Sequence, residues 1–195
     1  MKTIKESILS STGAGMSGMI IDLLENYYIN GLSKPLKRGE DFEVNGNEIH
    51  FKCSTIKLTK SSLPNIKEMQ KLQGYVFVCE GNSSFVELEL YGLKINKDML
   101  KKVNSSGLYL NLYNCKIDKS SYIPKCDLTV KGCIVDFDKI KNMEGIYIDK
   151  KTFFLSNWEK LKNIKVIFDT DSHFGSGNQD NIDRTNYEFI YSALK

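Results

Sequence analysis

The sequence is poor in the residues on which most enzyme active sites depend. It has two histidines, His50 and His173, and it contains no H-E-x-x-H, G-x-S-x-G or Walker pattern. Glu87 and Glu89 share one face of a predicted strand, but nothing in the sequence builds an apolar pocket around them. We therefore expect no catalytic residues, no cofactor and no enzyme activity.

Arginine is almost absent as well. Apart from Arg38 and Arg184, the positive charge is carried by lysines interspersed with acidic residues, and the net charge is only +3. Proteins that read nucleic acids gather their basic residues in one patch and use arginine to contact base edges. We expect no nucleic-acid partner.

The chain also lacks a long apolar run and a paired cysteine pattern. No stretch reaches the roughly 18–20 apolar residues that a membrane-spanning helix needs, and the N-terminus lacks the features of a secretory signal. The five cysteines form an odd set, which favours reduced thiols in a cytosolic setting. Cys115 and Cys133 hold equivalent positions in neighbouring repeats, where small buried apolar residues are a better interpretation than a disulfide.

What the sequence does have is a repeat. Apolar residues alternate in segments 86–95, 108–117 and 126–135, more weakly in 146–153, and briefly in 165–168. The period is about 20 residues, which is typical of stacked units that bury their apolar edges against one another. The second apolar position of each strand is Leu90, Leu112, Val130, Ile148 and Phe168.

Each unit continues in a similar way after its strand. An inward position follows, held by Leu93, Cys115, Cys133 and, against the pattern, Lys151. A residue able to cap a helix comes next, namely Asn96, Asp118, Asp136 and Ser156. The pattern predicts a strand, a turn, and a short helix or irregular return in every unit.

The L-x-L-x-x-[LC]-x-[IV] cores of segments 88–95, 110–117 and 128–135 resemble leucine-rich repeats. The similarity covers residues 86–168, although the usual asparagine column is missing and the unit lengths vary. It implies an α/β protein built as a short leucine-rich-repeat-like solenoid with a parallel strand face.

The sequence predicts one domain with four parts, of which the repeat region is one. Residues 1–32 read as an N-terminal helical cap interrupted by a flexible stretch at 10–18. Residues 33–85 read as an adaptor with a β-hairpin around Asn45-Gly46, packed on the solenoid of residues 86–168. Residues 169–195 read as a loop and a closing C-terminal helix at 183–194.

Two motifs point to other functions. Gly13, Gly15 and Gly18 spell G-x-G-x-x-G, so an enzyme or nucleotide-binding protein using a Gly13–Gly18 loop is the alternative, but the βαβ context that this motif needs is absent. The Asp169–Asp183 segment has several carboxylates but lacks the spacing of a calcium loop, so we expect no metal site.

The outward positions of the repeat strands form three columns. These contain Glu87, Tyr109, Asp127 and Lys165; Glu89, Asn111, Thr129, Tyr147 and Ile167; and Tyr91, Tyr113, Lys131, Asp149 and Asp169. Tyrosine favours strands in general, but it is also enriched in recognition surfaces. We expect a non-catalytic protein-binding surface made by Tyr91, Tyr109, Tyr113, Tyr147, Glu89 and Asn111.

The opening segment, residues 2–13, resembles the N-termini of uncharacterised proteins of crAss-like tailed bacteriophages. This resemblance implies a phage-encoded protein located in the host cytoplasm or the virion. Its expected partner is another protein, with no membrane association. The apolar face of segment 19–29 is wide enough for self-association through the N-terminal helix.

Overall fold

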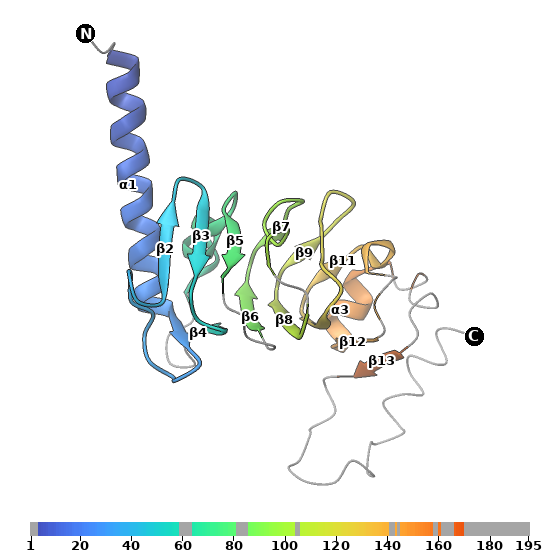
Figure 1. Ribbon diagram of the computed structural model, residues 1–195. Coiled ribbons are helices and arrows are strands. Elements are labelled where there is room, and N and C mark those ends of the chain that lie inside the picture. The colour runs from blue at the N-terminus through green and yellow to red at the C-terminus, as the bar shows by residue number, and fades with distance from the viewer. Residues whose placement is uncertain are drawn as a thin grey trace.

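The computed structural model describes residues 4–58, 64–80, 86–103, 106–140, 143, 145–157, 160 and 166–169, with the backbone alone for 4–14, 145 and 166–169. The predicted closing helix at 183–194 and most of the Asp169–Asp183 segment lie outside these residues. The protein is a mixed α/β structure with a parallel-strand sheet, a helix at its N-terminus and a short helix towards its C-terminus (Figure 1).

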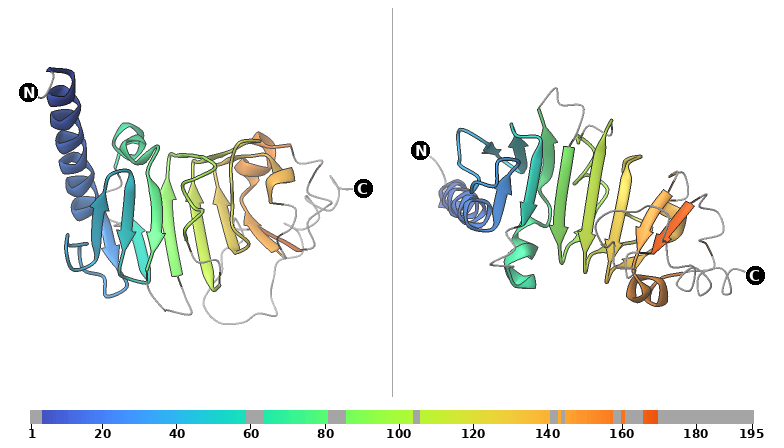
Figure 2. Two further views of the ribbon diagram at one scale, coloured as in Figure 1. Left: turned by 45° about the horizontal axis from the view of Figure 1, so that its top comes forward. Right: turned by 90° about the horizontal axis from the view of Figure 1, so that it is seen from below.

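The main sheet runs the length of the molecule in the order β1-β4-β6-β8-β10-β12-β13 (Figures 1 and 2). Its strands are β1 (Tyr28–Asn30), β4 (Thr55–Leu58), β6 (Val86–Tyr91), β8 (Leu108–Tyr113), β10 (Asp127–Lys131), β12 (Gly145–Ile148) and β13 (Val166–Asp169). All neighbours pair in parallel except β1 and β4. Strands from the first two predicted parts of the chain therefore join the sheet of the repeats.

Two three-stranded sheets accompany the main sheet. One has the order β11-β9-β7, from β7 (Lys94–Ile95), β9 (Lys116–Ile117) and β11 (Ile134–Val135), and the other has the order β2-β3-β5, from β2 (Phe42–Asn45), β3 (Glu48–Phe51) and β5 (Val76–Cys79). Each of the first three repeats contributes one strand to the main sheet and one to the β11-β9-β7 sheet, with a sharp turn between them.

One apolar core is shared by all these sheets. Alternate residues of the long strands are buried, as the sequence predicts, and so is the inward residue of each short strand. The set comprises Leu88, Leu90, Leu110, Leu112, Leu128, Val130, Ile146 and Ile148 from the main sheet, with Ile95, Ile117 and Val135 from the short strands. The alternating pattern of the first four repeat strands is thus confirmed.

The turn after each strand is held by a ladder of inward side chains. Leu93 N donates to Cys115 Sγ at 3.4 Å, Cys115 N donates to Cys133 Sγ at 3.3 Å, and Cys133 N donates to Thr152 Oγ1 at 2.9 Å. Both cysteines are buried free thiols, as expected. The fourth member of this column is Thr152, and the assignment of Lys151 to it is wrong because the last unit enters a helix directly.

The segments that connect one repeat strand to the next contain less helix than the repeat pattern predicts. Asn96 and Asp118 close turns by accepting backbone N–H groups, and Asp136 caps the 3₁₀ helix η2 (Phe137–Lys139). The fourth unit forms α3 (Lys150–Leu155) immediately after β12, capped by Asp149 instead of Ser156. A second short helical stretch, α2 (Ile66–Met69) with η1 (Gln70–Leu72), lies between β4 and β5.

The N-terminal segment differs from the prediction. Helix α1 (Ile4–Tyr27) is continuous, so the expected flexible break at 10–18 is wrong and the three glycines lie within the helix. Its C-terminal turns are anchored by Ile20, Leu23 and Leu24, whose side chains are buried. The remainder extends beyond the sheets (Figure 1), with Met16 and Met19 exposed.

The β2-β3 hairpin is present, but its turn is displaced by one residue from the prediction. Asn45 pairs with Glu48, which leaves Gly46 and Asn47 as the two loop residues. Gly46 has a φ of 61°, whereas Asn47 is not among the residues with positive φ. This combination matches a type II′ turn, which places glycine first, whereas a loop made of Asn45 and Gly46 would favour type I′.

Candidate functional site

The predicted binding surface corresponds to the outward side of the main sheet. We call it the strand face and define it as Thr55, Lys57, Glu87, Glu89, Tyr91, Tyr109, Asn111, Tyr113, Asp127, Thr129, Lys131 and Tyr147. None of these side chains is fully buried, and the residues between them on the same strands lie in the core. All six residues of the predicted site, Tyr91, Tyr109, Tyr113, Tyr147, Glu89 and Asn111, are on this face.

The strand register brings the predicted residues together in rows. Tyr91 is opposite Tyr113, and Glu89 is opposite Asn111. The second row continues through Thr129 to Tyr147 on β12. Since neighbouring strands lie about 4.8 Å apart, residues of one row are direct lateral neighbours.

The register at the end of the sheet corrects the predicted columns. Tyr147 is opposite Phe168, and Ile167 is opposite Ile146, so the predicted pairing of Tyr147 with Ile167 is wrong by one residue. Lys165 lies outside the described residues. The brief 165–168 segment has too few residues for alternation to fix its phase.

Asp149 does not belong to the strand face. Its carboxylate accepts the N–H of Gly132 at 2.9 and 3.0 Å and caps α3 by accepting the N–H of Thr152. In the corresponding turn of the preceding repeat, the N–H of Asn114 donates to the backbone carbonyl of Lys131. The Asp149 carboxylate takes the place of such a carbonyl. Asp149 is a structural residue of the turn.

One end of the strand face carries a small polar network. Lys57 Nζ lies 2.7 Å from Glu87 Oε1, and Asn111 Nδ2 donates to the same oxygen at 3.3 Å. Lys57 was not among the predicted residues because strand β4 was not assigned to the repeat sheet. The sequence does contain a signal for this strand, because Ile56 and Leu58 alternate with polar neighbours.

The tyrosines differ in their surroundings. Tyr109 is 43% exposed, whereas Tyr91 is partly buried against the core. Burial raises the pKa of Tyr113 to about 12, and the charges of Glu89 and Glu87 contribute in the same direction. Tyr113 therefore remains protonated at neutral pH and lies close to both carboxylates.

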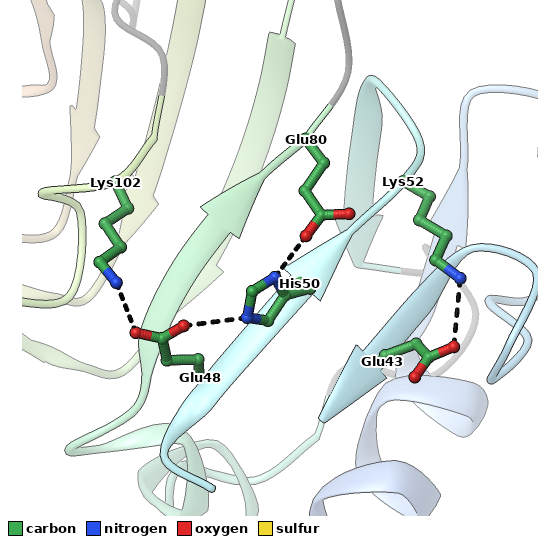
Figure 3. A network of polar contacts seen from close by, with 6 residues as sticks. All are labelled: Glu43, Glu48, His50, Lys52, Glu80 and Lys102. Carbon is green, nitrogen blue, oxygen red and sulfur yellow. Dashed lines mark hydrogen bonds and ion pairs between the residues drawn. The ribbon is translucent and has the colours of Figure 1, made fainter. Parts of the chain in front are cut away.

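A second polar cluster lies at the β2-β3-β5 sheet (Figure 3). The side chain of His50 is only 20% exposed because it lies between Glu80 at Nδ1 and Glu48 at Nε2. Hydrogen bonding to Glu80, supported by that to Glu48, raises the pKa of His50. The two carboxylates favour the imidazolium form, in which both ring nitrogens donate and no lone pair is left to act as a base.

The same cluster joins distant parts of the chain. Glu48 Oε1 lies 2.6 Å from Lys102 Nζ, and Glu43 pairs with Lys52 at 3.1 Å (Figure 3). Among the described residues, no group of three or more His, Cys, Asp or Glu side chains is arranged to hold a metal ion. Through the His50–Glu80 and Glu48–Lys102 ion pairs, the cluster links β3 to the end of β5 and to the segment before β8.

The thiols outside the ladder are not activated. Burial raises the pKa of Cys53 to about 11 and the pKa values of Cys79 and Cys126 to about 12. A nucleophilic cysteine requires a lowered pKa, since the thiolate is the reactive species. These three residues are held in their unreactive form at neutral pH.

The Gly13–Gly18 segment has no loop geometry. A phosphate-binding G-x-G-x-x-G sequence forms a turn between a strand and a helix, where backbone N–H groups point at the phosphate. Here the whole segment is helical and no strand precedes it within residues 4–18. The interpretation as a nucleotide-binding loop is therefore not supported at these residues.

No helix of the described chain is long and apolar enough to cross a membrane. Comparison of the chain with protein-family models, curated proteins and solved structures finds no match.

Proposed function

We propose that the protein is a non-catalytic binding module, built as a short leucine-rich-repeat-like solenoid, which captures another protein on its strand face. The main support for this proposal is the arrangement of the strand-face residues in lateral rows. Parallel strands follow one another in chain order and place Tyr91, Tyr109, Tyr113 and Tyr147 among Glu89 and Asn111. Tyrosine offers a large contact area at a low entropic cost and adds a hydroxyl for specificity.

Two of the sheet edges, at β1 and at β5, are already covered by this chain, which favours a binding site on the face of the main sheet. The outer side of β1 is covered by the chain that follows it, since Leu36 N donates to Tyr28 O and Asn30 N donates to Lys34 O. Along β5, Phe77 N donates to Met99 O and Val78 bridges to Lys102. These edges are already occupied by this chain, which disfavours binding of a partner strand there.

The resemblance of the opening segment supports a phage-encoded protein, and we place its action in the host cytoplasm or the virion. The exposed Met16 and Met19 on α1 make this helix the proposed region for any self-association. Binding on the strand face does not depend on that contact.

A matched pair of tyrosines tests the proposal. Tyr109 on the strand face and Tyr122 in the loop after β9 are 43% and 42% exposed. The partner would be captured with the tagged protein from lysates of the native host and identified, and then measured against Tyr109→Ala and Tyr122→Ala. Alanine substitution of an interface anchor costs about 2 kcal/mol or more in binding, whereas a surface residue outside the interface costs almost nothing.

We expect Tyr109→Ala to weaken partner binding and Tyr122→Ala to leave it unchanged. Both variants should unfold within about 0.5 kcal/mol of the native protein, because each side chain is substantially exposed. Equal binding by the native protein and Tyr109→Ala, confirmed with Tyr147→Ala, would contradict the proposal.

A further inference from the structure

Helix α1 extends into solvent beyond the sheets. Its C-terminal turns are anchored by Ile20, Leu23 and Leu24, and the sheets lie beside that end of the helix (Figures 1 and 2). The part that precedes these residues contains three glycines, and glycine is among the residues least favourable to a helix. Most helices in proteins draw their stability from packing against another element. The projecting turns of α1 therefore call for a partner.

One side of this helix has a pattern that is symmetrical about its centre. Six positions follow one another at alternating spacings of three and four residues, which is the spacing at which two paired helices meet. We call these positions the outer stripe, which consists of Lys5, Ile8, Thr12, Gly15, Met19 and Asp22. From either end, the stripe begins with a charged residue, continues with an apolar one and reaches a small uncharged one. The charges at its two ends are opposite.

The C-terminal half of the outer stripe faces away from the core. Gly15, Met19 and Asp22 are exposed, whereas their neighbours Ile20 and Leu23 are buried. Met19 is 49% exposed, and a Cβ atom at Gly15 would meet no atom within 4 Å. The Asp22 carboxylate has no ion-pair or hydrogen-bond partner in the described part of the chain. This half of the stripe is thus open to another molecule.

We propose that a second copy of this chain binds the outer stripe, with the two α1 helices antiparallel. An interface with two-fold symmetry brings the same surface of both copies together, so that surface has to be complementary to itself. The outer stripe meets this condition. In the antiparallel register the opposite positions are Lys5 and Asp22, Ile8 and Met19, and Thr12 and Gly15. Each charge then meets its opposite, the apolar residues pack together, and the small residues let the helices approach at the middle.

The antiparallel direction follows from the charges and from the position of the sheets. A parallel pair would place Lys5 beside Lys5 and Asp22 beside Asp22, and like charges in contact are unfavourable. It would also bring the sheets of both copies to the same end of the helices, whereas an antiparallel pair keeps them at opposite ends (Figure 1). Positions 5 to 22 span about 26 Å of helix. The contact is separate from the strand face, so it does not depend on the proposed function.

Charge reversal provides the test. Sedimentation velocity would measure the self-association of the full-length native protein, of Lys5→Glu, of Asp22→Lys and of the double variant. Either single variant creates two like-charge pairs across the symmetry axis, and the double variant restores two opposite-charge pairs. Both changes suit the helix dipole, because they add negative charge near its N-terminus or positive charge near its C-terminus, so the helix itself should be preserved. Circular dichroism would check this.

The control is Glu40→Lys, which changes the net charge as Asp22→Lys does, at an exposed position outside α1. We expect the native protein to form a dimer with twice the 22.2 kDa mass of the chain. Dimerisation should be about tenfold weaker in either single variant, because two symmetrical ion pairs are reversed, and unchanged in Glu40→Lys and in the double variant. An equimolar mixture of the two single variants should also recover the dimer, since each copy supplies the charges that the other lacks.

A native protein that remains monomeric at every concentration would overturn the inference and leave the stripe to a different protein. Equal losses in Asp22→Lys and Glu40→Lys would overturn it as well, because the effect would then belong to the net charge. A dimer that tolerates both single variants but is lost in Tyr109→Ala would place the contact on the strand face and would also contradict the inference. None of these results bears on capture of another protein by the strand face, except the last.

Discussion

The side-chain amide of Gln73 closes the outer edge of strand β7 by exchanging two hydrogen bonds with the backbone of Lys94. Gln73 Nε2 donates to Lys94 O at 2.7 Å, and Lys94 N donates to Gln73 Oε1 at 3.1 Å. A neighbouring strand would offer the same pair of groups. One side chain thus takes the place of a strand at this edge of the β11-β9-β7 sheet.

Replacing Gln73 with alanine should therefore destabilise the protein. Both hydrogen bonds are solvent-accessible, and each contributes about 0.5–1.5 kcal/mol, so we expect a loss of about 1–2 kcal/mol in urea unfolding. Gln70→Ala is the matched control, because Gln70 is also exposed and begins the 3₁₀ helix η1, for which Gln73 is the C-cap residue. Equal unfolding free energies for the two variants would show that the Gln73 amide does not support the edge.

The opposite edge of this sheet is closed by side chains of the last unit. Thr152 Oγ1 accepts from Cys133 N and donates to Val130 O at 3.2 Å, and Ser156 Oγ accepts from Val135 N at 2.8 Å. Farther along, Asn157 Oδ1 accepts from Phe137 N at 2.9 Å. The unit that forms α3 in place of a short strand supplies hydroxyl and amide groups where a strand would supply carbonyls.

Thr152 gives a sharp test of this edge because its side chain is fully buried. Thr152→Val keeps the shape but leaves the Cys133 N–H unpaired and removes one of the two hydrogen bonds to the Val130 carbonyl, which also accepts from Asp149 N. We therefore expect a loss of about 1–3 kcal/mol. Thr152→Cys should cost less, because a thiol fills the equivalent position at Cys115 and Cys133. A Thr152→Cys variant with a lower unfolding free energy than Thr152→Val would show that hydrogen bonds of these inward side chains do not stabilise the turns.

The long strands could be predicted from the sequence because one of their faces is buried. In segments 86–95, 108–117 and 126–135, a shift of one residue would exchange core and surface, so alternation fixes the phase. The six proposed binding residues follow from the same alternation, and the structure places them on one face. What they bind is a separate question, which alternation does not address.

The errors arose where local patterns carry less information. Thr152 was missed because the last unit enters α3 directly after β12, which moves the inward position one residue further along the chain than in the other repeats. The glycines of α1 indicated a break, since glycine disfavours helices by about 1 kcal/mol, but the helix continues through them beyond the turns anchored at Leu23 and Leu24. The Gln73 amide and the His50 cluster join residues far apart in the chain, and no short-range pattern reports such contacts.

The corrected course of α1 leads to a prediction at Gly18. A Cβ atom at Gly18 would meet no atom within 4 Å, so Gly18→Ala should raise stability and helicity, by about 0.5–1 kcal/mol. Gly132→Ala should have the opposite effect, because Gly132 has a φ of 64° and a Cβ there would lie 2.6 Å from Asn114 Oδ1. Denaturant unfolding and circular dichroism of both variants would decide, and a destabilised Gly18→Ala would argue against the continuous helix.

The core register is tested at Leu112, which is fully buried in the middle of the main sheet. Leu112→Ala should cost about 2–5 kcal/mol through lost burial and the resulting cavity. Asn111→Ala, one position away on the strand face, is the control and should cost much less. Similar losses at the two positions would mean that the strand does not have one buried and one exposed side.

The last prediction concerns the pH dependence of the His50 cluster. The raised pKa of His50 means that the folded protein binds the imidazole proton more tightly than the unfolded chain does, in which histidine titrates near pH 6.5. The resulting stabilisation is complete below that value and is lost as the pH rises through the higher pKa of the folded state. The difference in unfolding free energy between the native protein and His50→Gln should therefore shrink as the pH rises above about 6.5. Glu43→Gln, which removes the adjacent Glu43–Lys52 pair but leaves His50 in place, is the control, and the same dependence on pH is not expected for it. A His50→Gln difference that is independent of pH would show that the imidazolium does not hold β3 and β5 together through Glu48 and Glu80.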